Sequence, residues 1–264
     1  MSAQASPTYD EIRDALLQSH DRLVATVATL SDPQLSEPSY DDDWTIAQVL
    51  SHLGSGAEVF TLFLEAGLQG EPAPGPEAMQ PVWESWNAKT PRDQAQDSLA
   101  ANAAFLDRIA DLSDADKEGW RLALFGDDQD LPALLRMRLS EHAVHSWDVL
   151  VALDSSASVD ANAVALLIDT LPRLVSMVAK PDELIRRIQV RTQAPDREFL
   201  LDLKPDSSRL TATSAPAGST DDELRLPAEA FLRLVYGRLD PEHTPPEVAG
   251  NAHLDVLRPV FPGL

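Results

Sequence analysis

The sequence predicts an α+β protein in which a bundle of helices precedes a small domain of strands and helices. Two observations support this class. Up to about residue 178, apolar residues recur at the three- and four-residue spacing of amphipathic helices. Beyond Lys180-Pro181, apolar and polar residues alternate between turn residues, which is typical of short strands. With 264 residues, 44% of them hydrophobic, the chain can form two modest domains. We expect them over residues 1–180 and 181–264.

The first domain is expected to contain four or five helices. The first covers residues 8–30 and the second residues 44–67, where Thr45 is followed three positions later by Gln48, the signature of a capping box. The Pro- and Gly-rich segment 70–81 is expected to be a loop. Further helices are expected at about 92–112, 131–153 and 159–178. Amphipathic helices joined by loops indicate an antiparallel bundle.

The second domain is expected to begin with three antiparallel strands. They lie in 185–192, 197–204 and 209–214, separated by turn residues. The segment 222–240 is predicted to be a short strand that enters a helix at Pro227. For the final segment, 246–261, we expect a strand, a turn and a terminal helix.

Composition excludes several classes of function. The net charge of −22 repels phosphate backbones and anionic lipid, so we expect no binding to nucleic acid or membranes. An anionic ligand therefore needs a locally placed arginine. Cysteine is absent, which excludes thiolate metal ligands and a cysteine nucleophile, so any thiol must come from a small molecule. We see no apolar run of about 18 residues and no signal-peptide pattern, and we expect a cytoplasmic protein.

The helix predicted at 131–153 carries a polar stripe on an otherwise apolar surface. At about 100° per residue, the stripe spans roughly 80° of arc. It consists of Arg138, Glu141, His145 and Asp148. A helix that is apolar on most sides is buried, so these side chains must face something that satisfies them. Charges of another helix, solvent in a cleft and a cation are all possible partners.

Two residues of this stripe have the spacing of metal ligands. Glu141 and His145 lie one turn apart on the same side, which suits two ligands of one divalent metal, although an ordinary ion pair shows the same spacing. His52 on the second helix offers another imidazole, although alone it would be a core-edge or surface histidine. Together the three form a plausible zinc set with open coordination positions, as in a catalytic site. His142 points off this face and is expected at the surface or rim.

Three segments resemble the mycothiol-dependent maleylpyruvate isomerase family, within the DinB-like metalloenzyme superfamily. The segment "DDDWTIAQVLSHLGSGAEVF" resembles the family's W-x-V-x-D-V-x-A-H-L motif, and "RLSEHAVHSWDVLVALD" resembles its R-x-x-E-x-x-x-H-x-x-D motif. "LRLPAEAFLRLVYGRLDPEHTPPEVAGNAHLDVLRPVF" resembles its C-terminal domain, with Asn251 where many relatives have aspartate. The resemblance covers nearly the whole chain and implies a DinB-like four-helix bundle followed by the family's C-terminal domain. It also implies zinc on His52, Glu141 and His145, with mycothiol as the thiol.

The resemblance also implies a reaction. Zinc deprotonates a bound thiol, and the thiolate adds to a cis-enoyl carbon in a cleft between the domains. Rotation about the new single bond and expulsion of the thiol give the trans isomer, whereas a thiol S-transferase retains the adduct. Arg238 is the expected catalytic residue that grips a substrate carboxylate, unless it only caps a helix end.

Other roles stay open on sequence alone. Trp44 is expected to line the thiol cofactor pocket or to staple the start of the second helix. Asp148 would orient a metal ligand or act as an ordinary acidic partner, and Arg138 would balance Glu141.

Two further classes of function are compatible with the sequence. One is a DinB-like metal-dependent hydrolase, or an enzyme that uses another thiol. The other is a binding protein without catalysis, whose α+β domain holds an apolar or anionic ligand. We expect the partner to be a small anionic or electrophilic molecule, and the protein to be a monomer or weak homodimer.

Overall fold

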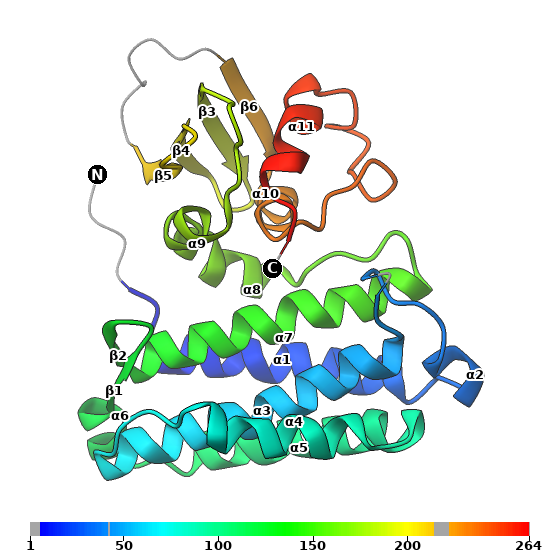
Figure 1. Cartoon of the computed structure of the whole chain (residues 1–264), viewed down its shortest axis with the longest axis vertical. Helices are drawn as coiled ribbons and strands as arrows, with labels where there is room; N and C mark the ends of the chain where they lie inside the picture. Colours follow the sequence, from blue (N-terminus) through cyan, green and yellow to red (C-terminus); the bar gives the residue numbers. More distant parts are fainter. Residues whose placement is uncertain (1–5, 42, 214–221, 264) are drawn as a thin grey trace. The chain divides into compact units, whose positions relative to one another are not determined.

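Figure 1 presents the computed structural model of the chain, which describes residues 6–41, 43–213 and 222–263. The chain forms two compact units that divide between Ser158 and Val159. We expected a boundary at residue 180. The division comes earlier because the helices of residues 161–178 pack against the strands and helices that follow them. The α+β class is confirmed, with helices first and a small sheet after them.

The helical unit is built on four long helices, as the sequence predicts (Figure 1). α1, α3, α5 and α7 pack against one another and enclose the core of this unit. The elements in order are α1 (Tyr9–Val27), α2 (Asp32–Leu35), α3 (Ile46–Gln69), α4 (Pro76–Asn87), α5 (Pro91–Ala110), α6 (Asp114–Gly119), β1 (Arg121–Leu124), β2 (Asp127–Asp130) and α7 (Leu131–Leu153).

Parts of this unit differ from the sequence prediction. The segment 70–81 is not a loop throughout, because α4 begins at Pro76, where proline is compatible with the first turn of a helix. We also did not predict the hairpin of β1 and β2. Its turn is made by Phe125 and Gly126, both with positive φ, and phenylalanine gives no sequence signal for such a turn.

The start of α3 confirms the predicted capping box. Gln48 N donates to Thr45 Oγ1 at 3.3 Å, and Thr45 N donates to Gln48 Oε1 at 2.8 Å. These bonds satisfy backbone groups that the first turn of a helix leaves unpaired. The helix start, six residues before His52, is therefore defined by local sequence.

Glycines in α3 let large aromatic side chains approach its backbone. A Cβ at Gly67 would lie 2.3 Å from the ring of Trp120, and a Cβ at Gly54 would lie 2.1 Å from the ring of Trp86. Trp120 is 1% exposed, and its indole N–H donates to the Leu64 carbonyl at 2.8 Å. The two tryptophans therefore fix α3 against its neighbours from two directions.

The other unit is a four-stranded sheet with helices. Its strand order is β5-β4-β3-β6, where β3 is antiparallel to β4, β4 is antiparallel to β5, and β6 is parallel to β3. The elements are α8 (Ala161–Leu167), a 3₁₀ turn (Ile168–Thr170), α9 (Leu171–Val178), β3 (Arg186–Gln193), β4 (Arg197–Leu203), β5 (Arg209–Ala212), β6 (Asp222–Pro227), α10 (Ala228–Val235), α11 (Ala252–Leu257) and a second 3₁₀ turn (Arg258–Val260). The three antiparallel strands and the strand that enters a helix at Pro227 are confirmed.

Two predictions for this part of the chain are wrong. The helix expected at 159–178 is interrupted by the 3₁₀ turn before Pro172, and it belongs to the sheet unit. No strand forms at 246–250, which is a turn before α11. Asn251 caps α11 by accepting a hydrogen bond from His253 N at 3.0 Å. Aspartate is a comparable N-cap, so asparagine at this position leaves the helix start intact.

The expectation that the chain has no apolar run of about 18 residues is wrong, because the segment 161–178 is apolar and long enough to pass as a membrane span on composition alone. In the structure it is two short helices, and Leu167, Leu171 and Val175 are fully buried. Core helices of soluble proteins pass the same test, so this segment is weak evidence for a membrane span.

We expect Gly67→Ala to destabilise the helical unit by about 1–3 kcal/mol, because the new methyl group overlaps the Trp120 ring. This cost exceeds the gain of about 1 kcal/mol from the higher helix propensity of alanine. The matched control is Gly119→Ala, where a Cβ has nothing within 4 Å. Urea denaturation measures both variants. Equal stability of the two would contradict the packing described for α3.

Candidate metal centre

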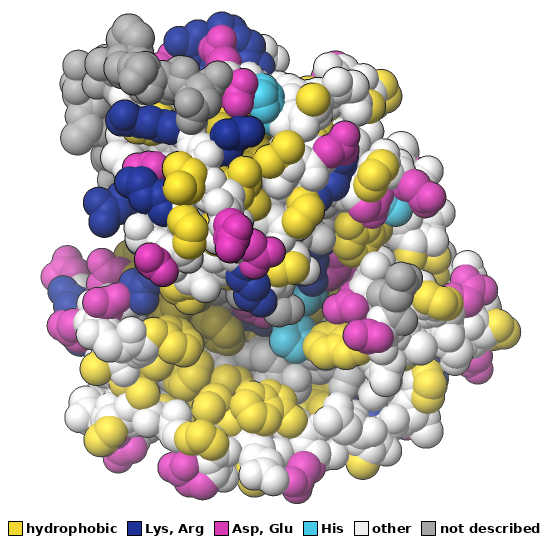
Figure 2. All heavy atoms as spheres, turned by 45° about the horizontal axis from the view of Figure 1, so that its top comes forward, with side chains coloured by type: hydrophobic (Ala, Val, Ile, Leu, Met, Phe, Trp, Pro, Cys, Tyr) yellow, Lys and Arg dark blue, Asp and Glu magenta, His cyan; other side chains and the backbone are white. Residues whose placement is uncertain are grey.

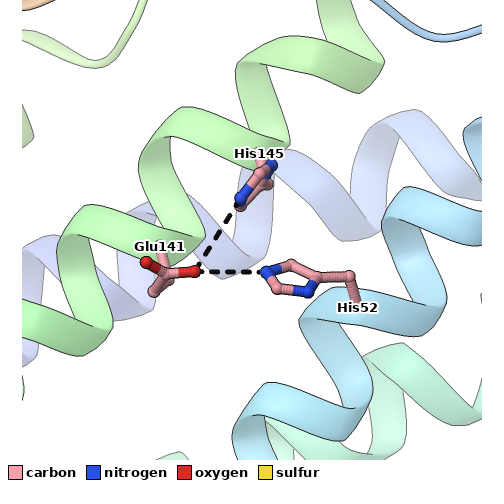
Figure 3. Close-up of side chains that lie close together, drawn as sticks. All are labelled: His52, Glu141 and His145. Atoms are coloured by element: carbon pink, nitrogen blue, oxygen red, sulfur yellow. Dashed lines mark hydrogen bonds and ion pairs between the residues drawn. The ribbon is translucent and has the colours of Figure 1, made fainter. Parts of the chain in front are cut away.

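Three side chains from two helices converge at one point (Figure 3). His52 extends from α3, and Glu141 and His145 extend from α7. Glu141 Oε2 lies 3.1 Å from His52 Nε2 and 3.8 Å from His145 Nε2. One donor atom from each residue lies within 4.8 Å of the others. The structure therefore brings together the three residues that the sequence singled out.

The donor set fits a divalent metal. In a tetrahedral zinc site with ligand distances of about 2.0–2.2 Å, two ligand atoms lie about 3.4 Å apart. The separations of 3.1 and 3.8 Å bracket this value. The side chains of His52 and Glu141 are 35% and 36% exposed, and that of His145 is 17% exposed. Two imidazoles and one carboxylate on a partly open face are the ligand types of catalytic zinc sites, which keep a position for water or substrate.

Asp148 fixes the orientation of His145. The carboxylate is fully buried, and its Oδ2 lies 2.9 Å from His145 Nδ1. A carboxylate can only accept this hydrogen bond, so Nδ1 carries the proton and the Nε2 lone pair faces Glu141 and His52. Of the two roles left open for Asp148, the geometry matches the orienting one.

Glu141 is held in its ionised form. Burial raises the pKa of its carboxyl group, but the hydrogen bond with His52 and the charges of His145, His52 and Arg138 outweigh this and lower the pKa to about 2. Since a metal needs the carboxylate rather than the acid, Glu141 is in the form that binds a metal at neutral pH.

Trp44 lies against both histidines. Its ring centroid is 5.2 Å from that of His52 and 6.4 Å from that of His145, where the rings are stacked at 27°. It also packs against the hydrophobic core that includes Val49, as a staple at the helix start does. Its position is compatible with both expected roles, and contact with a thiol cofactor stays a prediction.

Arg138 has partners that sequence alone did not reveal. It is 1% exposed and donates to the Leu53 carbonyl at 2.8 Å and to the side-chain oxygen of Asn102. Its charge acts on Glu141 through space. Asn102 gives no sequence signal for this role, because it lies on α5, far from either metal segment.

The expectation that His142 lies at the surface or rim is wrong. It is 2% exposed between α1 and α7, with Ser19 Oγ at 2.8 Å and Ser146 Oγ at 3.2 Å from its Nδ1. The ring of His20 lies 6.2 Å away. α1 packs against α7, so this position off the ligand face is enclosed rather than solvated.

Arg238 belongs to the sheet unit, whereas the triad belongs to the helical unit. It is 7% exposed, and its Nη1 donates to the carbonyl of Tyr236, the C-cap residue of α10, at 2.8 Å. This is the capping interaction that we named as the alternative. A role in gripping a substrate carboxylate stays a prediction.

Side chains of different kinds are interspersed on the surface of the molecule. Figure 2 shows hydrophobic, acidic and basic side chains over the visible face, with a few histidines among them. α3 contains no lysine or arginine, and Glu58 and Glu65 are its charged residues. α3 therefore contributes no lysine or arginine to the surroundings of His52.

Comparisons with known proteins agree on one family. The family described as "Mycothiol maleylpyruvate isomerase N-terminal domain" matches residues 16–150, just over half of the chain. Two solved structures, of a mycothiol-dependent maleylpyruvate isomerase and of its histidine-to-alanine mutant, match with a TM-score of 0.63 and 14% identity. Each match covers 88% of this chain and 90% of the other. No curated protein matches the chain.

Acid should destabilise the metal-free protein partly through buried histidines. Burial lowers the pKa of His20, and burial together with the charge of Arg138 lowers that of His142. The unfolded chain therefore takes up protons near pH 6.5 that the folded chain does not, and stability falls as the pH drops below that value. We expect His20→Gln to show a weaker loss of stability between about pH 7.5 and about pH 5.5 than the wild type. Urea denaturation at the two values measures it, with His243→Gln as control. An unchanged loss in His20→Gln would exclude this contribution.

We expect Asp148→Asn to weaken metal binding about 10- to 100-fold, because it removes the charge that holds the His145 tautomer. Titration of the metal-free protein with Zn²⁺ measures this effect. Asp154→Asn is the control, since Asp154 is an exposed carboxylate at the end of the same helix. A folded Asp148→Asn protein with wild-type affinity would show that the Asp148–His145 contact does not support the site.

Proposed function

The chain belongs to the mycothiol maleylpyruvate isomerase family, and on this premise we propose that it is a metal-dependent isomerase that uses mycothiol as cosubstrate. The metal, which we propose to be zinc, is held by His52, Glu141 and His145. One observation carries the proposal: these three side chains, from two helices, lie within 4.8 Å of one another on a partly exposed face.

The chemistry of the residues supports this role. When bound, zinc deprotonates a coordinated thiol near neutral pH and so supplies a thiolate nucleophile. Glu141 contributes the negative charge of the ligand set, and Asp148 keeps His145 in the tautomer that presents Nε2. Trp44 covers one side of both histidines. The chain has no cysteine of its own that would compete for the metal.

The proposed reaction consumes no thiol. The mycothiol sulfur forms a bond to one carbon of a cis double bond, and the electron pair of that bond moves onto the adjacent conjugated carbonyl. The former double bond is now single and rotates. The electron pair then returns, the C–S bond breaks, and the trans isomer leaves with mycothiol regenerated. Maleylpyruvate is the substrate that the family name points to.

A thiol S-transferase would stop after the first bond forms. A proton would then add to the carbanion, and the product would keep the sulfur. Mass spectrometry separates the two reactions, because only the transferase product gains the mass of mycothiol. A product that has gained the elements of water, formed without any thiol, would instead support a DinB-like hydrolase.

We expect removal of the metal with a chelator to abolish mycothiol-dependent isomerisation of maleylpyruvate, and added Zn²⁺ to restore it. The absorbance change of the cis-to-trans conversion follows the rate. Full activity of the metal-free protein, or activity without mycothiol, would contradict the proposal.

His52→Ala and His145→Ala should each lower the rate by about two orders of magnitude or more, because each removes one of three ligands. His253→Ala, a histidine of the sheet unit, is the control. Bound zinc, measured by elemental analysis, should fall with the rate in the first two variants only. Zinc that stays bound at the wild-type level in both variants would place the metal elsewhere.

A further inference from the structure

A buried arginine lies directly behind the candidate metal centre. Arg138 is on α7, three residues before Glu141, and is 1% exposed. Burial lowers the pKa of its guanidinium to about 10, so it remains a cation at neutral pH. A buried charge is costly unless it gains good partners. Its position therefore requires a physical reason.

The hydrogen bonds of Arg138 connect the two helices that carry the candidate ligands. Its Nη2 donates to the carbonyl of Leu53, the residue after His52, at 2.8 Å. The same Nη2 donates to the side-chain oxygen of Asn102 on α5, whose amide in turn lies 3.4 Å from the Leu53 carbonyl. The helix that bears Glu141 and His145 is thus tied to the backbone beside His52.

The sequence of α3 leaves room for this guanidinium. Gly56 lies one turn after His52, and a Cβ there would come within 3.0 Å of Arg138 Nη1. One turn further on, the ring of Phe60 lies 5.7 Å from the guanidinium carbon, within the range of a cation–π contact. These residues let the cation approach the α3 backbone closely.

The hydrogen bonds of Arg138 go to neutral oxygens rather than to the Glu141 carboxylate. Among the residues that the structure describes, the acceptors of Arg138 are neutral oxygens, and no carboxylate forms an ion pair with it. A direct ion pair through Glu141 Oε2 would engage the oxygen that lies 3.1 Å from His52 Nε2 and 3.8 Å from His145 Nε2. Hydrogen bonding to Leu53 and Asn102 instead leaves Oε2 available to a metal.

We propose that Arg138 is a positioning residue of the metal site. Its hydrogen bond to the Leu53 carbonyl sets the spacing between His52 and the pair Glu141 and His145. This inference rests on the proposed function, because it assumes that the triad binds a metal.

The test is the metal affinity of folded, metal-free variants, measured by titration with Zn²⁺ and by the visible absorption of bound Co²⁺. We expect Arg138→Met to lower the affinity at least about tenfold, as loss of a group that orients ligands does. Arg138→Lys keeps the charge but not the planar donor geometry, and should recover part of the loss. Arg136→Met, on the same helix, should bind as the wild type does. A purely structural role would lower the unfolding temperature but leave the affinity and the Co²⁺ spectrum unchanged.

Asn102→Ala provides a second variant in case Arg138→Met does not fold. It removes one acceptor and keeps the buried charge, so the affinity should fall by a smaller factor, about threefold or more. Wild-type affinity in folded Arg138→Met, or in folded Asn102→Ala if Arg138→Met does not fold, overturns the positioning role and leaves the proposed function standing. A wild-type protein that binds neither Zn²⁺ nor Co²⁺ overturns the proposed function itself.

Discussion

The structure of the helical unit depends on satisfying a polar stripe along α7, a helix that is otherwise apolar. Each group on that stripe has a different kind of partner. Asp148 is buried against His145, Arg138 donates to a backbone carbonyl and an amide, and Glu141 lies between two imidazoles. Because unpaired polar groups in a core cost several kcal/mol, these partners allow α7 to lie in the core of the unit. The position of the candidate site thus follows from the burial of the helix.

α3 is the complementary element, and its small residues determine how closely its neighbours approach. Gly54, Gly56 and Gly67 face a tryptophan, a guanidinium and another tryptophan. Each glycine lies where a side chain would displace its neighbour, so the packing of the bundle and the position of His52 are linked. Catalytic and binding sites depend on such supporting contacts, because a small displacement of a ligand side chain distorts the geometry of the site.

Local signals in the sequence were enough to predict much of this. The 100° rule placed four residues of α7 on one face, and the Thr45–Gln48 pair marked the start of α3. The spacing of apolar residues predicted the long helices and the three antiparallel strands, and the structure contains them. Features that depend on contacts between distant segments were not predicted. One is the burial of His142, which α1 encloses although the residue lies off the ligand face. Likewise, no pattern in the sequence indicates that Arg138 pairs with Asn102 on α5. α4 was missed for a local reason, because proline and glycine at its start are typical of loops.

The central claim is that His52, Glu141 and His145 share one metal ion. Anomalous diffraction at the zinc edge from crystals of the zinc-loaded protein tests it most directly. The account requires a single strong peak about 2.0–2.2 Å from one donor atom of each residue. A peak on other residues, or no peak between α3 and α7 in zinc-loaded crystals, would contradict it.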